Sequence, residues 1–308
     1  MVKLIVNSDG KAYYTRDGKM LLTSSSGSTA GIPREISPEG VCQIPTQSFT
    51  FSLPTNAIDV GNSAFQRGFR GYTALTDVDL SGLTEVSGNN AFDSAFTDCT
   101  HLATVDLSSL ITISGTSGLA YAFQGCTNLT TVDLSNLTTV SSYEGLSYTF
   151  NGCTSLTNID LSSLTTVSGE NGLAYIFYDC TSLTTVDLSN LTTISGYNAF
   201  GDIFYRCSNL ESVNFSSLNT ITGSSAFNYA FAQCTALADI YFPALTTTSF
   251  GSAINQFNRM MNGTGTSINH TIHFPSNLES TVQALSGYPL FGGFSGYVVL
   301  AFDLPATS

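Results

Sequence analysis

Hydrophobic and polar positions follow three patterns within a short stretch that recurs along the chain. In residues 129–135, LTTVDLS, the two leucines and the valine are apolar, the residues between them are polar, and the last part alternates strictly. Strict alternation predicts a short strand with one buried face. Leu137 and Val140 predict a second extended stretch on another side. Residues 146–150 place apolar side chains at helical spacing, which predicts a short helix or 3₁₀ turn.

The pattern returns every 27 residues. Six full repeats occupy residues 69–230 without insertion or deletion, and degenerate repeats lie on either side. One repeat has too little apolar area to bury its own hydrophobic face, so like units must stack. The sequence therefore predicts a mostly β solenoid of 27-residue coils, each with a strand, an extended segment and a short helical turn. Phenylalanines mark the register at Phe69, Phe96, Phe123, Phe150, Phe177, Phe204 and Phe231.

The ends of the chain depart from the repeat. Residues 1–31 predict a small N-terminal β module followed by a Ser/Gly-rich linker. Residues 32–250 form the predicted solenoid. Residues 251–308 predict a C-terminal cap made of a strand, a short helix and a closing strand. Such a cap is needed because the last coil would otherwise expose its apolar cross-section and an unpaired strand edge.

Two segments carry a resemblance to a known family. The strand pattern L-x-x-V-x-L, as in Leu129, Val132 and Leu134, is similar to the leucine-rich-repeat signature, and residues 53–65, LPTNAIDVGNSAF, resemble the BspA-like (treponemal-type) leucine-rich repeat. The resemblance extends over about residues 49–250. It implies a right-handed leucine-rich-repeat solenoid, capped at both ends. It also implies a non-enzymatic binding or adhesion scaffold with diverse ligands.

Composition and charge narrow the possible partners. Only 10% of the residues are charged and the net charge is −13, which argues against nucleic acid because phosphate binding needs a basic surface. No run of 18 apolar residues predicts a membrane span. The first 20 residues lack a signal-peptide pattern. We expect an extracellular, cell-surface or virion location, and the missing signal suggests a phage virion or tail component that is released by lysis.

Six cysteines share one position of the repeat. No C-x-x-C spacing or accompanying histidine points to a metal site. We expect buried free thiols that act as small apolar side chains, with Cys42 outside the set and without an assigned role. The six are Cys99, Cys126, Cys153, Cys180, Cys207 and Cys234.

Aspartates occupy one position on the outward face of the predicted strand, and we call this set the carboxylate ladder. Stacked carboxylates about 5 Å apart repel each other by about 0.8 kcal/mol per pair in water. They are tolerated if they are solvated or bonded to neighbouring Ser and Thr, and the functional alternative is an acidic groove for Ca²⁺, a basic peptide or a polar glycan. Residues 71–205 contain 13 Asp and Glu and no Lys or Arg. The ladder consists of Asp79, Asp106, Asp133, Asp160 and Asp187.

A tyrosine column lies two residues before the phenylalanines. Its members are expected either to pack half-buried between coils or to form an aromatic strip that stacks on sugar rings or on a protein partner. The column consists of Tyr121, Tyr148, Tyr175 and Tyr229.

The sequence predicts no catalytic residues and no metal ligands. A repeat that copies one carboxylate five times is the opposite of an acid–base pair, whose members need different environments. The predicted function is therefore a binding or adhesion scaffold for a protein or glycan on a cell surface. The alternative is a structural protein that self-assembles, as a homo-oligomer or in a virion, through its solenoid faces or its C-terminal cap.

Overall fold

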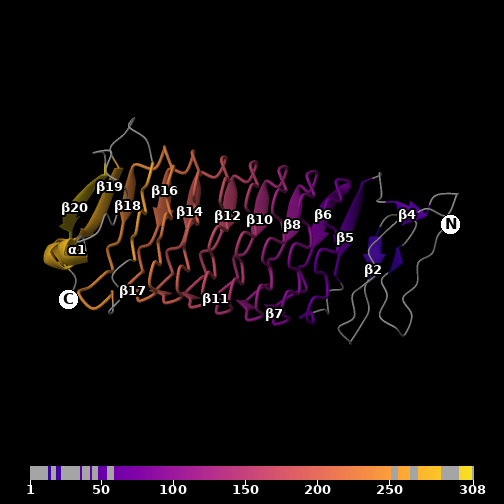
Figure 1. The fold of residues 1–308 in the computed structure, drawn as a ribbon, viewed down its shortest axis with the longest axis horizontal. Coiled ribbons are helices and arrows are strands. Elements are labelled where there is room, and N and C mark those ends of the chain that lie inside the picture. The colour runs from indigo at the N-terminus through magenta and orange to yellow at the C-terminus, as the bar shows by residue number, and fades with distance from the viewer. Residues whose placement is uncertain are drawn as a thin grey trace.

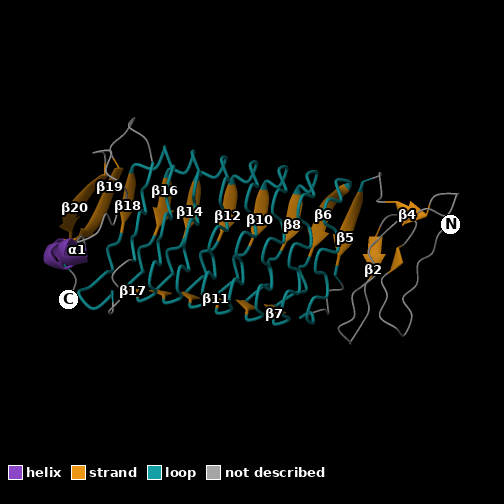
Figure 2. Ribbon diagram, viewed as in Figure 1, coloured by secondary structure: helices purple, strands orange, loops and turns teal. Residues whose placement is uncertain are grey.

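The computed structural model describes residues 13–14, 19–21, 35–36, 42–43, 48–53, 59–250, 256–263, 270–285 and 298–306. Within these residues the chain winds into an elongated stack of coils, and equivalent segments of successive coils lie side by side (Figure 1). Two sheets run along different sides of the stack, and loops and turns connect them (Figure 2). The predicted solenoid of 27-residue coils is confirmed.

The larger sheet has 12 strands, and every neighbouring pair from β2 onward is parallel. Its register steps by one repeat, so Val132 lies beside Val105 and Ile159. Its strands, in the order in which they lie, are β1 (Tyr13–Tyr14), β2 (Lys19–Leu21), β5 (Phe49–Ser52), β6 (Leu75–Asp79), β8 (Thr104–Asp106), β10 (Thr131–Asp133), β12 (Asn158–Asp160), β14 (Thr185–Asp187), β16 (Ser212–Asn214), β18 (Asp239–Tyr241), β19 (His270–Pro275) and β20 (Val298–Leu304).

The second sheet has six parallel strands of two residues each. Each strand buries its second residue. Before three of the strands, a threonine donates its hydroxyl to a carbonyl of the preceding coil, as Thr165 does to Thr138 at 3.0 Å. This is the second extended stretch predicted from the sequence. The strands are β7 (Glu85–Val86), β9 (Thr112–Ile113), β11 (Thr139–Val140), β13 (Thr166–Val167), β15 (Thr193–Ile194) and β17 (Thr220–Ile221). A separate pair comprises β3 (Glu35–Ile36) and β4 (Cys42–Gln43).

The third side of each coil differs in detail from the predicted short helix or 3₁₀ turn. Its amides alternate between i→i−3 bonds within the coil and bonds to the next coil, as when Ala122 bonds Leu119 and Phe123 bonds Thr149. Every fourth residue takes a left-handed φ, for example 56° at Tyr121. The spacing of the coils explains this difference. An α-helix is about 10 Å wide, whereas paired strands repeat about every 4.8 Å, so a helix in every coil fits only where the stack curves strongly. This stack runs nearly straight (Figure 1).

The core is a stack of phenylalanines beside the six cysteines. Phe123 and Phe150 are fully buried, and their rings lie parallel with centroids 5.7 Å apart. Each cysteine is a buried free thiol that donates to a phenylalanine carbonyl, as Cys153 does to Phe123 at 3.2 Å. Burial raises the pKa of Cys99 to about 12. The prediction of buried free thiols is therefore confirmed, while the side chain of Cys42 lies outside the described residues.

Both ends of the stack extend the larger sheet. At the N-terminal end, β1 and β2 form an antiparallel hairpin, and β2 pairs with β5. At the C-terminal end, β19 is followed by the short 3₁₀ helix η1 (Ser276–Leu278), by α1 (Glu279–Leu285) and then by β20. This order matches the predicted strand, helix and closing strand. The predicted linker lies outside the described residues, and the division at residues 31 and 250 stays a prediction.

Candidate functional site

The structure aligns the carboxylate ladder along the outward face of the larger sheet. Each aspartate lies beside the next in strict register, from Asp79 on β6 to Asp187 on β14. One carboxylate oxygen of every member accepts the backbone amide of the serine two residues on, at 2.8–3.0 Å. This local bond ends the strand with an Asx turn, as aspartate commonly does. The aspartates therefore have a structural role in every coil.

The members of the ladder differ in exposure. Asp79 and Asp106 are half-buried, whereas Asp133, Asp160 and Asp187 are exposed. Asp79 also accepts hydrogen bonds from the hydroxyls of Ser52 and Ser81. Solvation at the exposed members is what allows like charges to stack, and it leaves these carboxylates accessible to a partner.

The ladder ends at a change of residue type. In the same row of the sheet, Asn214 lies beside Asp187, Tyr241 beside Asn214, and His273 beside Tyr241. Asn214 keeps the same turn, because its side-chain oxygen accepts the Ser216 amide at 3.0 Å. The row therefore passes from negative charge to a neutral amide and then to two aromatic rings.

His273 is clamped between two carboxylates. Its Nδ1 lies 2.9 Å from Asp303 and its Nε2 lies 3.2 Å from Asp239. Burial alone would lower the pKa of His273, but the hydrogen bonds and charges of Asp303 and Asp239 outweigh burial and raise it. Tyr241 stacks on the imidazole with ring centroids 4.3 Å apart and planes 11° apart. Because both ring nitrogens are bonded to carboxylates, the orientation of the imidazole is fixed, and neither nitrogen is left to accept a proton from a nucleophile.

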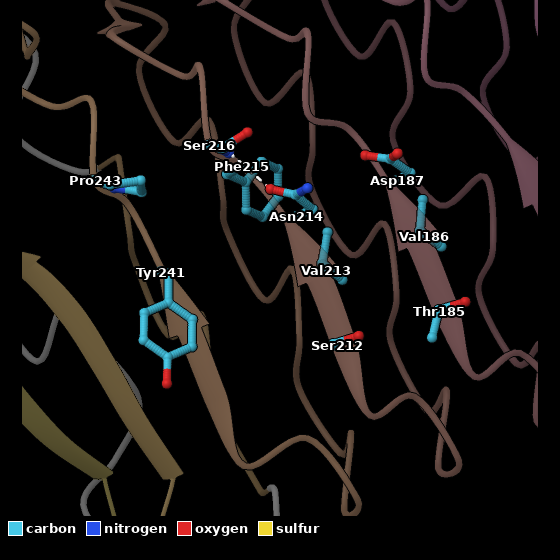
Figure 3. A pocket seen from close by; sticks show the side chains of 10 residues that line it. All are labelled: Thr185, Val186, Asp187, Ser212, Val213, Asn214, Phe215, Ser216, Tyr241 and Pro243. Atoms are coloured by element: carbon cyan, nitrogen blue, oxygen red, sulfur yellow. Dashed lines mark hydrogen bonds between the residues drawn. The ribbon is translucent and has the colours of Figure 1, made fainter.

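A groove of about 450 Å³ opens where the row changes (Figure 3). Asp187 and Asn214 lie along its floor on adjacent strands, and Tyr241 and Pro243 lie toward the C-terminal side. Tyr241 is 45% exposed, a high value for so large a ring. Sequence reasoning identified Asp187 but missed Tyr241, although Tyr241 lies 27 residues after Asn214 in the same register.

Three members of the tyrosine column are brought together, and the fourth is not. Tyr121, Tyr148 and Tyr175 stack half-buried, with neighbouring centroids 4.6 and 4.3 Å apart. Such spacing leaves no room for a sugar ring between them, so only the outer faces of the stack remain for a ligand. Tyr229 instead accepts a hydrogen bond from Arg259, whose guanidinium lies 5.6 Å from the ring centroid.

Asp202 takes the tyrosine position in the coil that follows Tyr175. It is only 8% exposed, and burial raises its pKa to about 6, although a hydrogen bond with Tyr175 opposes the shift. Tyr178 and Tyr205 form a second stack nearby, with centroids 4.7 Å apart. Sequence reasoning missed these residues because they replace the usual residue in one or two repeats only. The 27-residue register could have identified them, because Asp202 lies 27 residues after Tyr175 and Tyr205 lies 27 residues after Tyr178.

No metal centre is seen in the part of the chain that the structure describes: no three His, Cys, Asp or Glu side chains there are arranged to hold an ion. Ca²⁺ binding by the carboxylate ladder stays a prediction of the sequence. The described residues also contain no helix of the length and apolarity needed to cross a membrane.

Comparison with known proteins identifies the class. The chain matches the BspA-type leucine-rich-repeat region in overlapping segments, 45–144, 89–201, 120–253 and 147–280, so it belongs to this family of repeat scaffolds. The predicted resemblance is thereby confirmed. No curated protein is detectably similar to the chain in sequence.

Solved structures similar to this chain include two that are leucine-rich-repeat proteins by name. A T. pallidum leucine-rich-repeat protein is 20% identical, with a TM-score of 0.45, over 76% of this chain and 91% of its own. A Bacteroides ovatus leucine-rich-repeat protein is 17% identical, with a TM-score of 0.22, over 96% of this chain and 99% of its own. An internalin from Listeria monocytogenes is 11% identical, with a TM-score of 0.20, over 94% of this chain and 82% of its own. These distant similarities do not specify a ligand.

Proposed function

We propose that this protein is a non-enzymatic scaffold that binds a cationic protein on a cell surface through the outward face of its larger sheet. The observation that carries the proposal is the carboxylate ladder. Three exposed carboxylates lie in register in a stretch of 135 residues without a Lys or Arg of its own. Repulsion between them is a cost that a partner of opposite charge would relieve.

The other two sides of the coil offer less to a partner. Threonine hydroxyls of the second sheet bond carbonyls of the neighbouring coil, as at Thr138, Thr165 and Thr192. On the turn side, the stacked tyrosines cover one another's faces. These threonines and stacked tyrosines are engaged within the solenoid, although Tyr143 and Tyr197 on the turn side are exposed. The exposed carboxylates of the sheet face, by contrast, form one continuous row of like charge.

A binding screen with charge-matched variants tests the proposal. The full chain is applied to arrays of extracellular proteins, basic peptides and glycans, with Ca²⁺ or with a chelator. The test variant is Asp133→Asn/Asp160→Asn/Asp187→Asn, because Asn214 shows that asparagine keeps the Asx turn. We expect its affinity for the protein partner to fall at least tenfold, and the salt dependence of binding to weaken.

The matched control carries the same charge change away from the larger sheet, as Glu85→Gln/Glu144→Gln/Glu170→Gln. It should keep wild-type affinity. Equal losses in both variants would mean that net charge, and not the ladder, drives binding. If a glycan binds with an affinity that changes neither with salt nor in either variant, the partner is a glycan and not a cationic protein. Loss of binding in chelator alone would assign a role to Ca²⁺.

Self-assembly is the second candidate, and the open edge of the larger sheet favours it. β20 is the last strand of the sheet and pairs with β19 alone among the described strands, and its Val299 is 47% exposed. An unpaired edge is a template for another chain. Light scattering of the full chain separates the candidates: a stable oligomer supports assembly, and a monomer supports ligand binding. A place in a phage virion stays a prediction of the sequence.

A further inference from the structure

Where the carboxylate ladder ends, a hydrogen-bond donor lies beside an acceptor. At every earlier step of the ladder, one carboxylate lies beside another. At the last step, Asn214 on β16 lies in register beside Asp187 on β14. Both side chains are exposed and line the groove of about 450 Å³ (Figure 3). A volume of this size is typical of small-ligand sites, which range from about 300 to 1,000 Å³.

A backbone amide fixes the orientation of the Asn214 side chain. The Ser216 amide donates to Oδ1 of Asn214 at 3.0 Å, and because an N–H group needs an acceptor, this atom must be the oxygen. The Nδ2 donor therefore lies on the side of Asp187 (Figure 3). Asp187 uses Oδ1 for the Ser189 amide, which leaves Oδ2 as an acceptor. Among the described residues, no hydrogen bond is seen at this Nδ2 or at this Oδ2.

A donor and an acceptor about 4.8 Å apart, on neighbouring strands, select against charged ligands. A guanidinium or an ammonium group only donates, so it cannot accept from Asn214. A carboxylate or phosphate group accepts, but Asp187 repels its charge. Two vicinal hydroxyls satisfy both groups, because one donates to the carboxylate while the other accepts from the amide. A carboxamide also carries a donor and an acceptor, so the ligand is neutral in either case.

The surroundings of the pair favour a sugar over the carboxamides of a peptide. A peptide that adds to a sheet pairs its backbone with an open strand edge, but β16 is already paired on both sides, with β14 and with β18. Hydroxyls of Thr185 and Ser212 line the same groove, and Tyr241 lies toward its C-terminal side. Side-chain hydroxyls both donate and accept, so they can bond the further hydroxyls of a sugar.

We propose that the groove at Asp187 and Asn214 binds a neutral sugar through two vicinal hydroxyls. One hydroxyl donates to Oδ2 of Asp187, and its neighbour accepts from Nδ2 of Asn214. The inference goes beyond the proposed function, because the ligand carries no charge, and it stands whether or not the ladder binds a cationic protein. A sixth aspartate at position 214 would keep the turn but would supply no donor.

Ligand-observed NMR with neutral trisaccharides tests the proposal on the full chain. The probes are maltotriose, mannotriose and galactotriose, which differ in whether their vicinal hydroxyls are cis or trans, and a blocked Gly-Asn-Gly peptide is the carboxamide probe. We expect at least one trisaccharide to bind more tightly than the peptide. Its affinity should be unchanged at about 0.5 M NaCl, because the ligand is neutral. The fully O-methylated trisaccharide has no hydroxyl donor and should not bind.

Exchanging the donor and the acceptor tests the assigned contacts. Asn214→Asp leaves two acceptors and Asp187→Asn leaves two donors, so each variant should weaken trisaccharide binding by about three- to tenfold. The double variant Asp187→Asn/Asn214→Asp restores one donor and one acceptor in reverse order. It should recover most of the affinity, because each hydroxyl of a diol can donate or accept. Its net charge equals that of the wild type, so net charge does not explain a recovery.

A matched control and the contrary outcomes complete the test. Asp133→Asn makes the same change two coils away, outside the groove, and should leave trisaccharide binding unchanged. Circular dichroism verifies that each variant is folded. The proposal is overturned if no trisaccharide binds, if the single variants bind like the wild type, or if the double variant stays as weak as they are. Tighter binding of the peptide would replace the sugar with a carboxamide ligand. Failure of the proposed function is a separate result, because it is read from salt-sensitive binding of a cationic protein.

Discussion

The turn side and the strand face of each coil both consist of one residue type copied along the stack, yet repetition has opposite consequences on the two sides. On the turn side and in the core, copied Phe and Tyr rings stack on the copy beside them, and each Cys donates to a Phe carbonyl of the preceding coil. On the strand face, each copied Asp is repelled by its neighbours. Stacking within the solenoid therefore accounts for the copied Phe, Cys and Tyr residues, whereas the copied Asp residues, beyond their Asx turns, suit contact with an external partner.

The largest expected effect comes from breaking the phenylalanine stack. Phe150 is fully buried, and its ring lies between those of Phe123 and Phe177, 5.7 and 6.1 Å away. Phe150→Ala should lower the free energy of unfolding by about 3–5 kcal/mol, because a cavity replaces the ring between two coils. Urea denaturation followed by circular dichroism measures the loss. Tyr197→Ser, at an exposed ring, is the control, and a similar loss there would contradict the comparison.

A smaller effect should appear on the turn side at Asp202. Burial raises its folded pKa to about 6, above the usual value of 3.8. A raised pKa means that the fold favours the protonated form, so stability from this group is complete below pH 4 and is lost as the pH rises through 6. Asp202→Asn should therefore stabilise the protein at pH 8 by about 1–2 kcal/mol and leave stability at pH 4 nearly unchanged.

The pH comparison has its own control. Asparagine can still accept the Tyr175 hydroxyl, so the variant changes charge more than packing. Thermal melts of both proteins from pH 4 to 8 give the difference curve. A difference that does not depend on pH would mean that Asp202 is accessible to water, and that the turn side is not closed as described.

On the strand face, removing one charge should stabilise the fold slightly. Asp160 is exposed between Asp133 and Asp187, and asparagine preserves the turn. Asp160→Asn should raise the melting temperature at low salt, and the gain should disappear at 0.5 M NaCl, because salt screens exposed charges. A gain that persists at high salt would show that the ladder does not experience mutual repulsion.

The six stacked cysteines should not react in the native state. Their thiols are buried, and burial raises the pKa values, to about 12 at Cys99. In a Cys42→Ser background, a thiol reagent at pH 8 should modify no cysteine until denaturant is added, and then six. Rapid modification of the folded protein would mean that the coils separate readily.

Much of the fold was readable because the period is constant. A 27-residue step without insertion places each residue beside its own copy, so the register, the buried cysteines and the position of the carboxylate ladder followed from counting. The conformation of the turn side did not follow, because residues such as Leu119 and Phe123 have helical spacing whether or not a helix fits. The small separation of the coils in this nearly straight stack excludes a helix, and the turn side instead takes left-handed φ angles such as that of Tyr121.

A stack of equal coils with an acidic strand face follows from the amino-acid sequence alone, because copies spaced by a constant period align in register. The groove in which that face ends depends instead on how the C-terminal residues pack. His273 lies beside Tyr241 although 32 residues separate them, and Asp303 reaches His273 from β20. Once the chain leaves the 27-residue period, the packing of the cap sets which side chains meet, and a local sequence pattern does not encode these contacts.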